Sequence, residues 1–259
     1  MTVKGILRYK FVRQTLYFII LIFSIEPIMN WYLRIGTNFE LSSHGINIYI
    51  SKSYMKEEKD SVYIRHIVDE AIQRLKGKNI TESEWNINAY FYYTNDEWDR
   101  KSLYYMTDNH AKTHAYLNFM MYCSASLVEN KISNYGSIRD LSETMAHELT
   151  HVYEYKKLVF LKYLYNRVLC DWKIEGFSDY IAGRTNIKFS EEMNKFENNY
   201  PDSSTFYTDY FLGHLRTDYL IRHRGISEDE YWNTNYNIEK LDNEIRQAIK
   251  NNEYKFENF

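Results

Sequence analysis

The chain has 259 residues, of which 44% are hydrophobic and 26% are charged, with a formal net charge of −3. These values are ordinary for a globular protein, and the length suits one domain that includes a small subdomain. The slightly negative charge gives no reason to expect a nucleic-acid partner. Cys123 and Cys170 are too few for a disulfide framework, and the sequence leaves open whether they pair.

The N-terminal segment has the layout of an export signal or a membrane anchor. Four basic residues precede the uncharged, mostly apolar run of residues 14–25: Lys4, Arg8, Lys10 and Arg13. This order predicts that residues 1–35 form an anchor or export signal and that the rest of the chain lies outside the membrane. The run is shorter than the ~18 residues of a confident membrane span, so the alternative is a helix buried within a cytosolic domain.

A compact α+β subdomain is expected from about Asn38. Residues 46–50 alternate between apolar and polar side chains, as a half-buried strand does. Apolar residues recur at helical spacing over residues 62–75, which predicts an amphipathic helix. Further strands are expected over residues 85–93 and 115–122.

A His-Glu-x-x-His motif follows inside an apolar helical run, with His147, Glu148 and His151 at its fixed positions. Residues four apart share a helix face, their Cβ atoms roughly 5–6 Å apart, so the two imidazoles can bind one cation. Glu148 is rotated by about 100° around the helix, which places its carboxylate within reach of a water beside the metal. A capping box at Ser137 and Asp140 is expected to begin this helix. The alternative is a solvated helix face that carries two histidines and a carboxylate.

A tetrahedral catalytic zinc needs a third protein ligand and one open position. Glu175 lies downstream in a second helix-compatible run, and Asp179 lies one turn further along the same face. Glu175 can therefore be the third ligand, and Asp179 can be the carboxylate that orients a ligating imidazole. Without His147 and His151, Glu175 would be interpreted as an ordinary exposed glutamate.

The two motifs together resemble the gluzincin metallopeptidases, the thermolysin-like clan with a His-Glu-x-x-His helix and a downstream glutamate. The Glu-Gly-Phe-Ser-Asp-Tyr segment of residues 175–180 is similar to the Glu-Gly-x-Ala-Asp-Tyr form common in that clan. The resemblance implies that Glu175 is the third zinc ligand and that Asp179 bonds to His147. It further implies an α+β fold, in which a small mixed sheet precedes a mainly helical lobe and the active-site cleft lies between them.

A weaker match follows the third ligand. Tyr210, Gly213 and Tyr219 fit the Tyr-x-x-Gly-x-x-x-x-x-Tyr-Leu pattern of the zinc aminopeptidases of the same clan. The resemblance implies that the phenol of Tyr210 stabilises the oxyanion. Tyr207, His214 and Tyr219 lie on or near the same predicted helix and are alternatives, as is plain core packing of Tyr210.

His110 and His114 are also four residues apart, but they lie in a stretch interpreted as a loop, and no carboxylate follows in matching register. They are not expected to form a second metal site. In gluzincins the strand before the metal helix forms the sheet edge along which a substrate peptide lies. The resemblance suggests that role for residues 115–122, with an ordinary packed strand as the alternative.

The remainder of the chain predicts a helical C-terminal half. Residues 186–204 are polar and are expected to form a surface excursion between helices. Helices are expected over three ranges: 206–222, 227–232 and 238–249. No repeat or low-complexity linker interrupts the sequence, so residues 38–259 are expected to form one zincin-like metallopeptidase domain.

These observations predict a membrane-anchored or secreted zinc metallopeptidase that hydrolyses peptide bonds without an acyl-enzyme. His147, His151 and Glu175 would hold Zn²⁺, and Glu148 would act as the general base. The expected partners are a peptide or protein substrate and the membrane, with the catalytic domain outside the cell. Two alternatives remain: a non-catalytic extracellular binding or sensing domain on a metallopeptidase scaffold, and a zinc hydrolase of a non-peptide amide such as a cell-wall bond.

Overall fold

The computed structural model describes residues 24–54, 60–81, 85–102, 109–135, 137–158, 160–183, 189–198 and 206–256 of the chain. The predicted anchor therefore lies largely outside the described residues, which include only its residues 24–35. Among the described residues, no helix is long and apolar enough to cross a membrane. Cys123 and Cys170 are free thiols.

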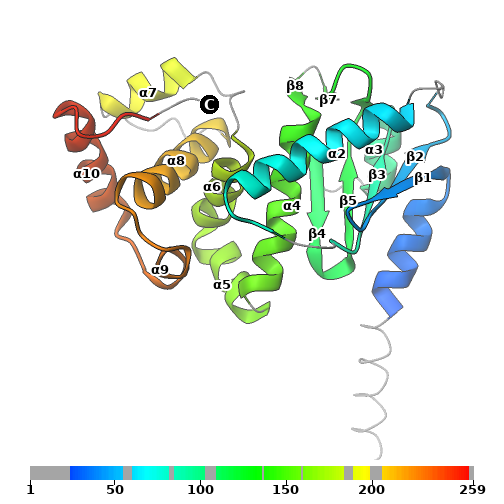
Figure 1. Cartoon of the computed structure of the whole chain (residues 1–259), viewed down its shortest axis with the longest axis horizontal. Coiled ribbons are helices and arrows are strands. Elements are labelled where there is room, and N and C mark those ends of the chain that lie inside the picture. The colour runs from blue at the N-terminus through cyan, green and yellow to red at the C-terminus, as the bar shows by residue number, and fades with distance from the viewer. Residues whose placement is uncertain are drawn as a thin grey trace, which may run out of the picture.

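The N-terminal half is built on a five-stranded mixed sheet of order β1-β2-β3-β5-β4 (Figure 1). Its strands are β1 (Thr37–Ser43), β2 (Ile46–Ser51), β3 (Ile87–Phe91), β4 (Ala111–His114) and β5 (Phe119–Tyr122). β2, β3 and β5 are parallel to one another, whereas β1 and β4 pair antiparallel at the two edges. A second, three-stranded antiparallel sheet follows, formed by β6 (Ala125–Ser126), β7 (Lys131–Asn134) and β8 (Ser137–Asp140).

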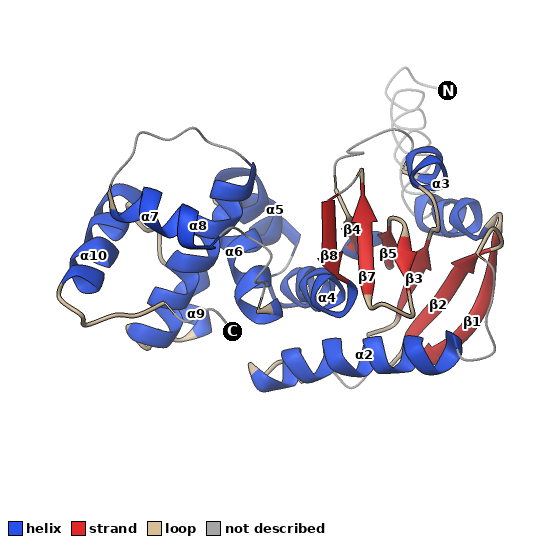
Figure 2. Cartoon of the chain, turned by 90° about the horizontal axis from the view of Figure 1, so that it is seen from above, coloured by secondary structure: helices blue, strands red, loops and turns tan. Residues whose placement is uncertain are grey.

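The C-terminal half is mainly helical, and α4 stands between the sheet and the other helices of this half (Figure 2). In chain order the helices are α4 (Leu141–Leu158), α5 (Phe160–Leu169), α6 (Asp171–Ala182), α7 (Phe189–Glu197), α8 (Phe206–Asp218), α9 (Glu228–Asn233) and α10 (Ile238–Lys250). A π-helical turn, Tyr219–His223, extends α8. The predicted α+β class, with a small mixed sheet before a mainly helical region, is confirmed.

Both faces of the five-stranded sheet are covered, which explains why β3 is almost entirely buried. Ile87, Ala89 and Phe91 pack in the large core with α2 (Asp60–Gly77) and α4, as their alternation predicts. Tyr90 belongs to a second cluster on the opposite face, which includes Leu33 of the N-terminal helix (residues 24–34) and Trp98 of α3 (Asn95–Lys101). α4 is thus held against the sheet from one side only, and its other side faces α6.

The predicted strand over residues 115–122 is wrong in its first half. Residues 115–117 form a 3₁₀ turn, and Asn118 has a left-handed backbone with φ of 54°, so strand β5 begins only at Phe119. β5 is also an internal strand, paired with β3 and β4. The sheet edge is instead β4, in the stretch that the sequence suggested was a loop.

The metal-motif helix begins later than predicted. Ser137 and Asp140 are the ends of strand β8, and α4 starts at Leu141. Asp140 nevertheless caps the helix, because its Oδ1 accepts a hydrogen bond of 2.9 Å from the backbone N–H of Glu143. The predicted capping box is therefore wrong: Asp140 is itself the capping residue, and Ser137 lies in the preceding strand. Residues 186–204 likewise differ from the expectation, since they contain helix α7.

α6 and α8 cross with their backbones in contact at Gly176 and Gly213. A Cβ built on Gly176 would lie 2.3 Å from the carbonyl oxygen of Gly213, and one built on Gly213 would lie 2.9 Å from the carbonyl oxygen of Trp172. No side chain fits between these helices at the crossing. Tyr210 lies one turn before this crossing on α8.

We predict that Gly176→Ala lowers the free energy of unfolding by about 3 kcal/mol, because the added methyl forces α6 and α8 apart in a dense core. Urea denaturation monitored by circular dichroism measures the change. Gly77→Ala is the matched control, since a Cβ at the end of α2 meets nothing within 4 Å. Equal stability of the two variants would contradict the backbone contact.

Candidate metal centre

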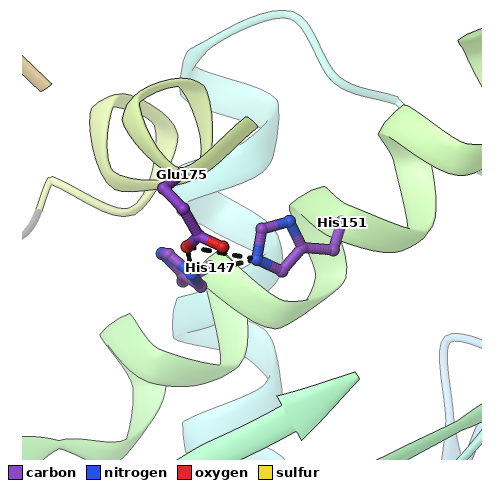
Figure 3. A group of neighbouring side chains, drawn as sticks. All are labelled: His147, His151 and Glu175. Carbon is purple, nitrogen blue, oxygen red and sulfur yellow. Dashed lines mark hydrogen bonds and ion pairs between the residues drawn. The ribbon is translucent and has the colours of Figure 1, made fainter. Parts of the chain in front are cut away.

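Three buried side chains converge between α4 and α6: His147 and His151 from α4, and Glu175 from α6 (Figure 3). The Nε2 atoms of the two imidazoles are 3.1 Å apart. Glu175 Oε2 lies 3.3 Å from His147 Nε2 and 3.6 Å from His151 Nε2. The structure therefore brings together the three residues that the sequence predicted as ligands.

The geometry of this group fits a metal ion. Ligand atoms held at about 2.0–2.1 Å from a tetrahedral zinc lie about 3.3 Å from one another, which is close to the three observed separations. Glu175 Oε2 is buried and has no well-aligned hydrogen-bond donor within the protein. A buried carboxylate oxygen without such a donor needs another partner, and a cation between the two imidazoles satisfies it. The group can hold a metal ion.

Each imidazole is oriented by a carboxylate on its far side. His147 Nδ1 lies 2.7 Å from Asp179 Oδ1, the contact that the family resemblance implied. His151 Nδ1 lies 3.0 Å from Glu154 Oε2, one turn further along α4. With Nδ1–H donating to a carboxylate, each ring directs the lone pair of Nε2 at the centre of the group. Three acceptor atoms then face one another, an arrangement that is stable only around a proton or a metal cation.

The pKa values of the buried groups also favour a cation at this site. Burial lowers the pKa of His151, but the carboxylates of Glu175 and Glu154 outweigh it and raise that pKa to about 10. Burial raises the pKa of Glu175, but His151, His147 and Arg167 together hold it well below its usual range. Burial raises the pKa of Glu154 to about 7 despite its contact with His151. The carboxylates around the two imidazoles thus stabilise positive charge at this position, carried by a proton or by a bound cation.

The second oxygen of Glu175 is occupied by an arginine. Arg167 of α5 donates to Glu175 Oε1, and its guanidinium also lies 3.1 Å from Asp171 Oδ1. Because Oε1 is engaged in this way, only Oε2 of Glu175 faces the two imidazoles. Glu175 is therefore arranged to bind an ion through one oxygen, which leaves room for a further ligand.

The two predicted catalytic residues, Glu148 and Tyr210, come from α4 and α8. Glu148 is buried on α4, next to His147 in sequence, and its negative charge contributes to raising the pKa of Tyr122 well above its usual value, after the larger effect of burial. The Tyr210 ring lies near the ring of His147, with centroids 6.3 Å apart. His214 packs on Tyr180 and Phe256 instead.

Tyr219 and Tyr207 are the other tyrosine alternatives for the group that stabilises the oxyanion. The Tyr219 hydroxyl donates to Glu244 Oε1 at 3.0 Å, and its ring stacks on His223, so it is engaged with the C-terminal helices. The side chain of Tyr207 lies outside the described part of the structure. Among the alternatives whose side chains are described, Tyr210 is the one that lies against a predicted metal ligand.

Sequence reasoning missed Glu154, Ser178 and Arg167. Ser178 Oγ lies 3.1 Å from His151 Nδ1 and 3.2 Å from Glu154 Oε1, so it links the imidazole to its carboxylate. Glu154 lies three residues after His151, a helical spacing that was a usable signal. Arg167 carried no such signal, because the turn between α5 and α6 determines where its guanidinium lies.

His110 directly precedes strand β4, and His114 is the last residue of that strand. His110 Nε2 lies 2.9 Å from the carbonyl oxygen of Ser137, and His114 packs against the ring of Phe119. Burial and Lys112 lower the pKa of His114 to about 4. Within the described residues, the group of His147, His151 and Glu175 is the one whose ligand atoms are close enough to hold an ion.

Comparison with known protein families finds no family model that matches the sequence, and comparison with curated proteins finds none that is significantly similar. The gluzincin resemblance therefore depends on the motifs themselves and on the buried group described above.

We predict that Glu154→Ala weakens zinc binding by about 10–100-fold, because His151 loses the carboxylate that orients it. Glu154→Gln should lose less zinc affinity, since its amide oxygen still accepts a hydrogen bond from Nδ1–H of His151. Competition against a chromophoric chelator measures the affinity, and Asp69→Asn, at an exposed carboxylate, is the control. Unchanged affinity in a folded Glu154→Ala protein would show that Glu154 does not position His151.

We also predict that zinc binding at neutral pH releases a proton. His151, with its pKa raised to about 10, is protonated in the metal-free protein at pH 7, and an ion must displace that proton. Apparent affinity should therefore rise as the pH rises toward 10. Calorimetric titration in two buffers of different ionisation enthalpy counts the protons, and an identical heat in both buffers would refute the prediction.

Proposed function

We propose that this protein is a zinc metallopeptidase of gluzincin type, which hydrolyses peptide bonds with water as the nucleophile. The observation that carries the proposal is the buried group of His147, His151 and Glu175, with the carboxylate of Glu148 next to it in sequence. Two imidazoles and one carboxylate are a ligand set of catalytic zinc, which keeps a fourth position for water or substrate.

The choice of zinc follows from the donors. Two neutral imidazole nitrogens favour a transition metal over calcium or magnesium, which prefer oxygen ligands. Zinc bound at this site would polarise a substrate carbonyl and lower the pKa of a water toward about 7. The protein's part is to hold the three ligands, through Asp179, Glu154 and Arg167, so that the site is fixed before substrate arrives.

The remaining chemistry belongs to two side chains. Glu148 is the general base that takes the proton of the attacking water, and it then returns the proton to the leaving amine. Its place next to His147 on α4 supports this role. The phenol of Tyr210 donates a hydrogen bond to the oxyanion that develops on the scissile carbonyl. Its position beside the His147 ring supports this role.

A polypeptide is the substrate that the neighbouring sheet edge favours. β4 is the edge strand of the five-stranded sheet, and its Thr113 donates to the backbone carbonyl oxygen of Glu148 at 3.3 Å. An extended peptide added to this edge would lie along α4 beside the metal group and would be recognised through its backbone. We assign the substrate-binding role to β4 in place of residues 115–122. We propose that the protein is anchored at the cell surface, with its catalytic domain outside the cell, or is secreted.

The proposal is tested by zinc analysis and cleavage of an unstructured protein such as casein. The wild-type chain should bind one zinc per molecule and lose activity with a chelator. Glu148→Gln should keep its zinc while kcat falls by about 10²–10⁴-fold, because the general base is removed. Glu175→Ala should lose zinc and activity together. Glu129→Gln, at an exposed carboxylate, is the control that should behave as wild type.

Two results would refute the proposal. A folded wild-type protein that binds no zinc even after metal is added would remove the metallopeptidase function. A Glu148→Gln protein that binds zinc and still cleaves casein at the wild-type rate would remove Glu148 as the base.

A further inference from the structure

The N-terminal helix (residues 24–34) has apolar side chains on both of its sides: Leu33 packs on the sheet beside buried polar groups, whereas other large apolar side chains are exposed. Asn30 is buried, donates to the carbonyl oxygen of Leu117 at 3.1 Å and accepts from Asn88 Nδ2 at 2.8 Å. Glu26 accepts a hydrogen bond of 2.9 Å from Asn118 Nδ2. These contacts fix which face of the helix lies on the sheet.

The outward face carries large apolar side chains at helical spacing. The side chains of Ile28, Trp31 and Ile35 are 57%, 66% and 50% exposed. Residues 28, 31 and 35 are three and four apart, so they follow one face from the helix into the turn after it. Phe39 of β1, 57% exposed, packs edge-on against Tyr49. We call these four exposed residues, Ile28, Trp31, Ile35 and Phe39, the outer apolar face.

Cationic side chains flank the outer apolar face. The guanidinium of Arg34 lies 4.9 Å from the centroid of the same Tyr49 ring that Phe39 contacts. Lys101 Nζ donates to the backbone carbonyl oxygens of Tyr32 and Ile35, at 2.8 and 2.7 Å. An apolar face with a Trp at its centre and cations beside it has the composition of a surface that meets lipid headgroups and acyl chains.

The sequence that leads into this helix identifies the occupant. Residues 14–25 are uncharged and mostly apolar, and in the sequence they come just before Ile28, the first residue of the outer apolar face. Four basic residues stand before them: Lys4, Arg8, Lys10 and Arg13. A soluble partner or a second copy would account for the exposed face but not for this continuity with a basic-flanked apolar segment, whereas a bilayer accounts for both.

We propose that the outer apolar face lies in the interface of a lipid bilayer, so that the folded domain itself, and not only the segment before it, contacts the membrane. The polar contacts of Asn30 and Glu26 hold the helix rigidly on the sheet. The bilayer contact therefore fixes how the whole domain is oriented. This inference is independent of the proposed peptidase activity.

The fluorescence emission of Trp31 tests this proposal. Of the five tryptophans, Trp85, Trp98 and Trp232 are at most 4% exposed, and Trp172 packs against Tyr231 and Tyr236. The full chain is reconstituted into vesicles of phosphatidylcholine and phosphatidylglycerol, with and without bromine on the acyl chains. We expect brominated lipid to quench the emission, Trp31→Phe to lose most of this quenching, and Trp31 to resist iodide in vesicles.

A second variant separates the face from the segment before it. Ile28→Asp/Ile35→Asp should leave the chain bound to vesicles but expose Trp31 to iodide and reduce its quenching by brominated lipid. Val62→Asp, at a 63% exposed position of α2, is the matched control and should change neither signal.

Two outcomes would overturn the inference. Trp31 that is open to iodide in vesicles and insensitive to brominated lipid would place the face in water. Protection from iodide that rises with protein concentration and does not depend on brominated lipid would assign the face to a second copy of the chain.

Discussion

The structure depends on one electrostatic constraint: five ionisable side chains are buried together between two helices. His147, His151 and Glu154 come from α4, and Glu175 and Asp179 come from α6. Burying a charged group without a partner is strongly unfavourable, so each must be matched by another group of the cluster. The carboxylates outnumber the imidazoles, and the pKa of His151 rises to about 10 as a result. A divalent cation at the centre would balance this charge, so the site and the stability of the α4–α6 interface are linked.

The scaffold around the cluster holds α4 and α6 at a fixed separation. On one side, α4 packs on the sheet through the large hydrophobic core, and its N-terminus is capped by Asp140 at the end of β8. On the other side, α6 is held by the glycine contact with α8, at the residue directly after Glu175. The Glu-Gly pair in the motif thus has two functions. The glutamate supplies an oxygen to the cluster, and the glycine permits the close helix crossing that positions it.

The sequence predicted the centre of the site well because helical spacing is local. The i and i+4 histidines, and the i and i+4 pair of Glu175 and Asp179, each needed only one regular helix to face the same way. The pairing between the two helices came from the family resemblance and not from spacing. Arg167 could not be predicted, since its contact with Glu175 depends on the turn that joins α5 to α6.

The errors in predicting the strands of the sheet also have identifiable structural causes. The run of residues 115–122 looks like one apolar strand, but Asn118 adopts a left-handed backbone that no apolar pattern reveals. The short, polar strand β4 lacks the alternation of a half-buried strand, and its pairing with β5 gives it strand structure. Edge strands of this kind depend on the neighbouring strand, so their prediction needs the sheet order as well as the local sequence.

The proposed membrane contact limits which peptide bonds can reach the metal group. The N-terminal helix and α4 cover opposite faces of the five-stranded sheet. Layers of secondary structure pack about 10 Å apart, so the metal group lies about 20 Å or more from the outer apolar face. A bilayer held against that face would keep the metal group well above the lipid headgroups. The bonds within reach would belong to extended, water-exposed segments of a protein and not to segments within the bilayer, which agrees with recognition of a peptide by the edge of β4.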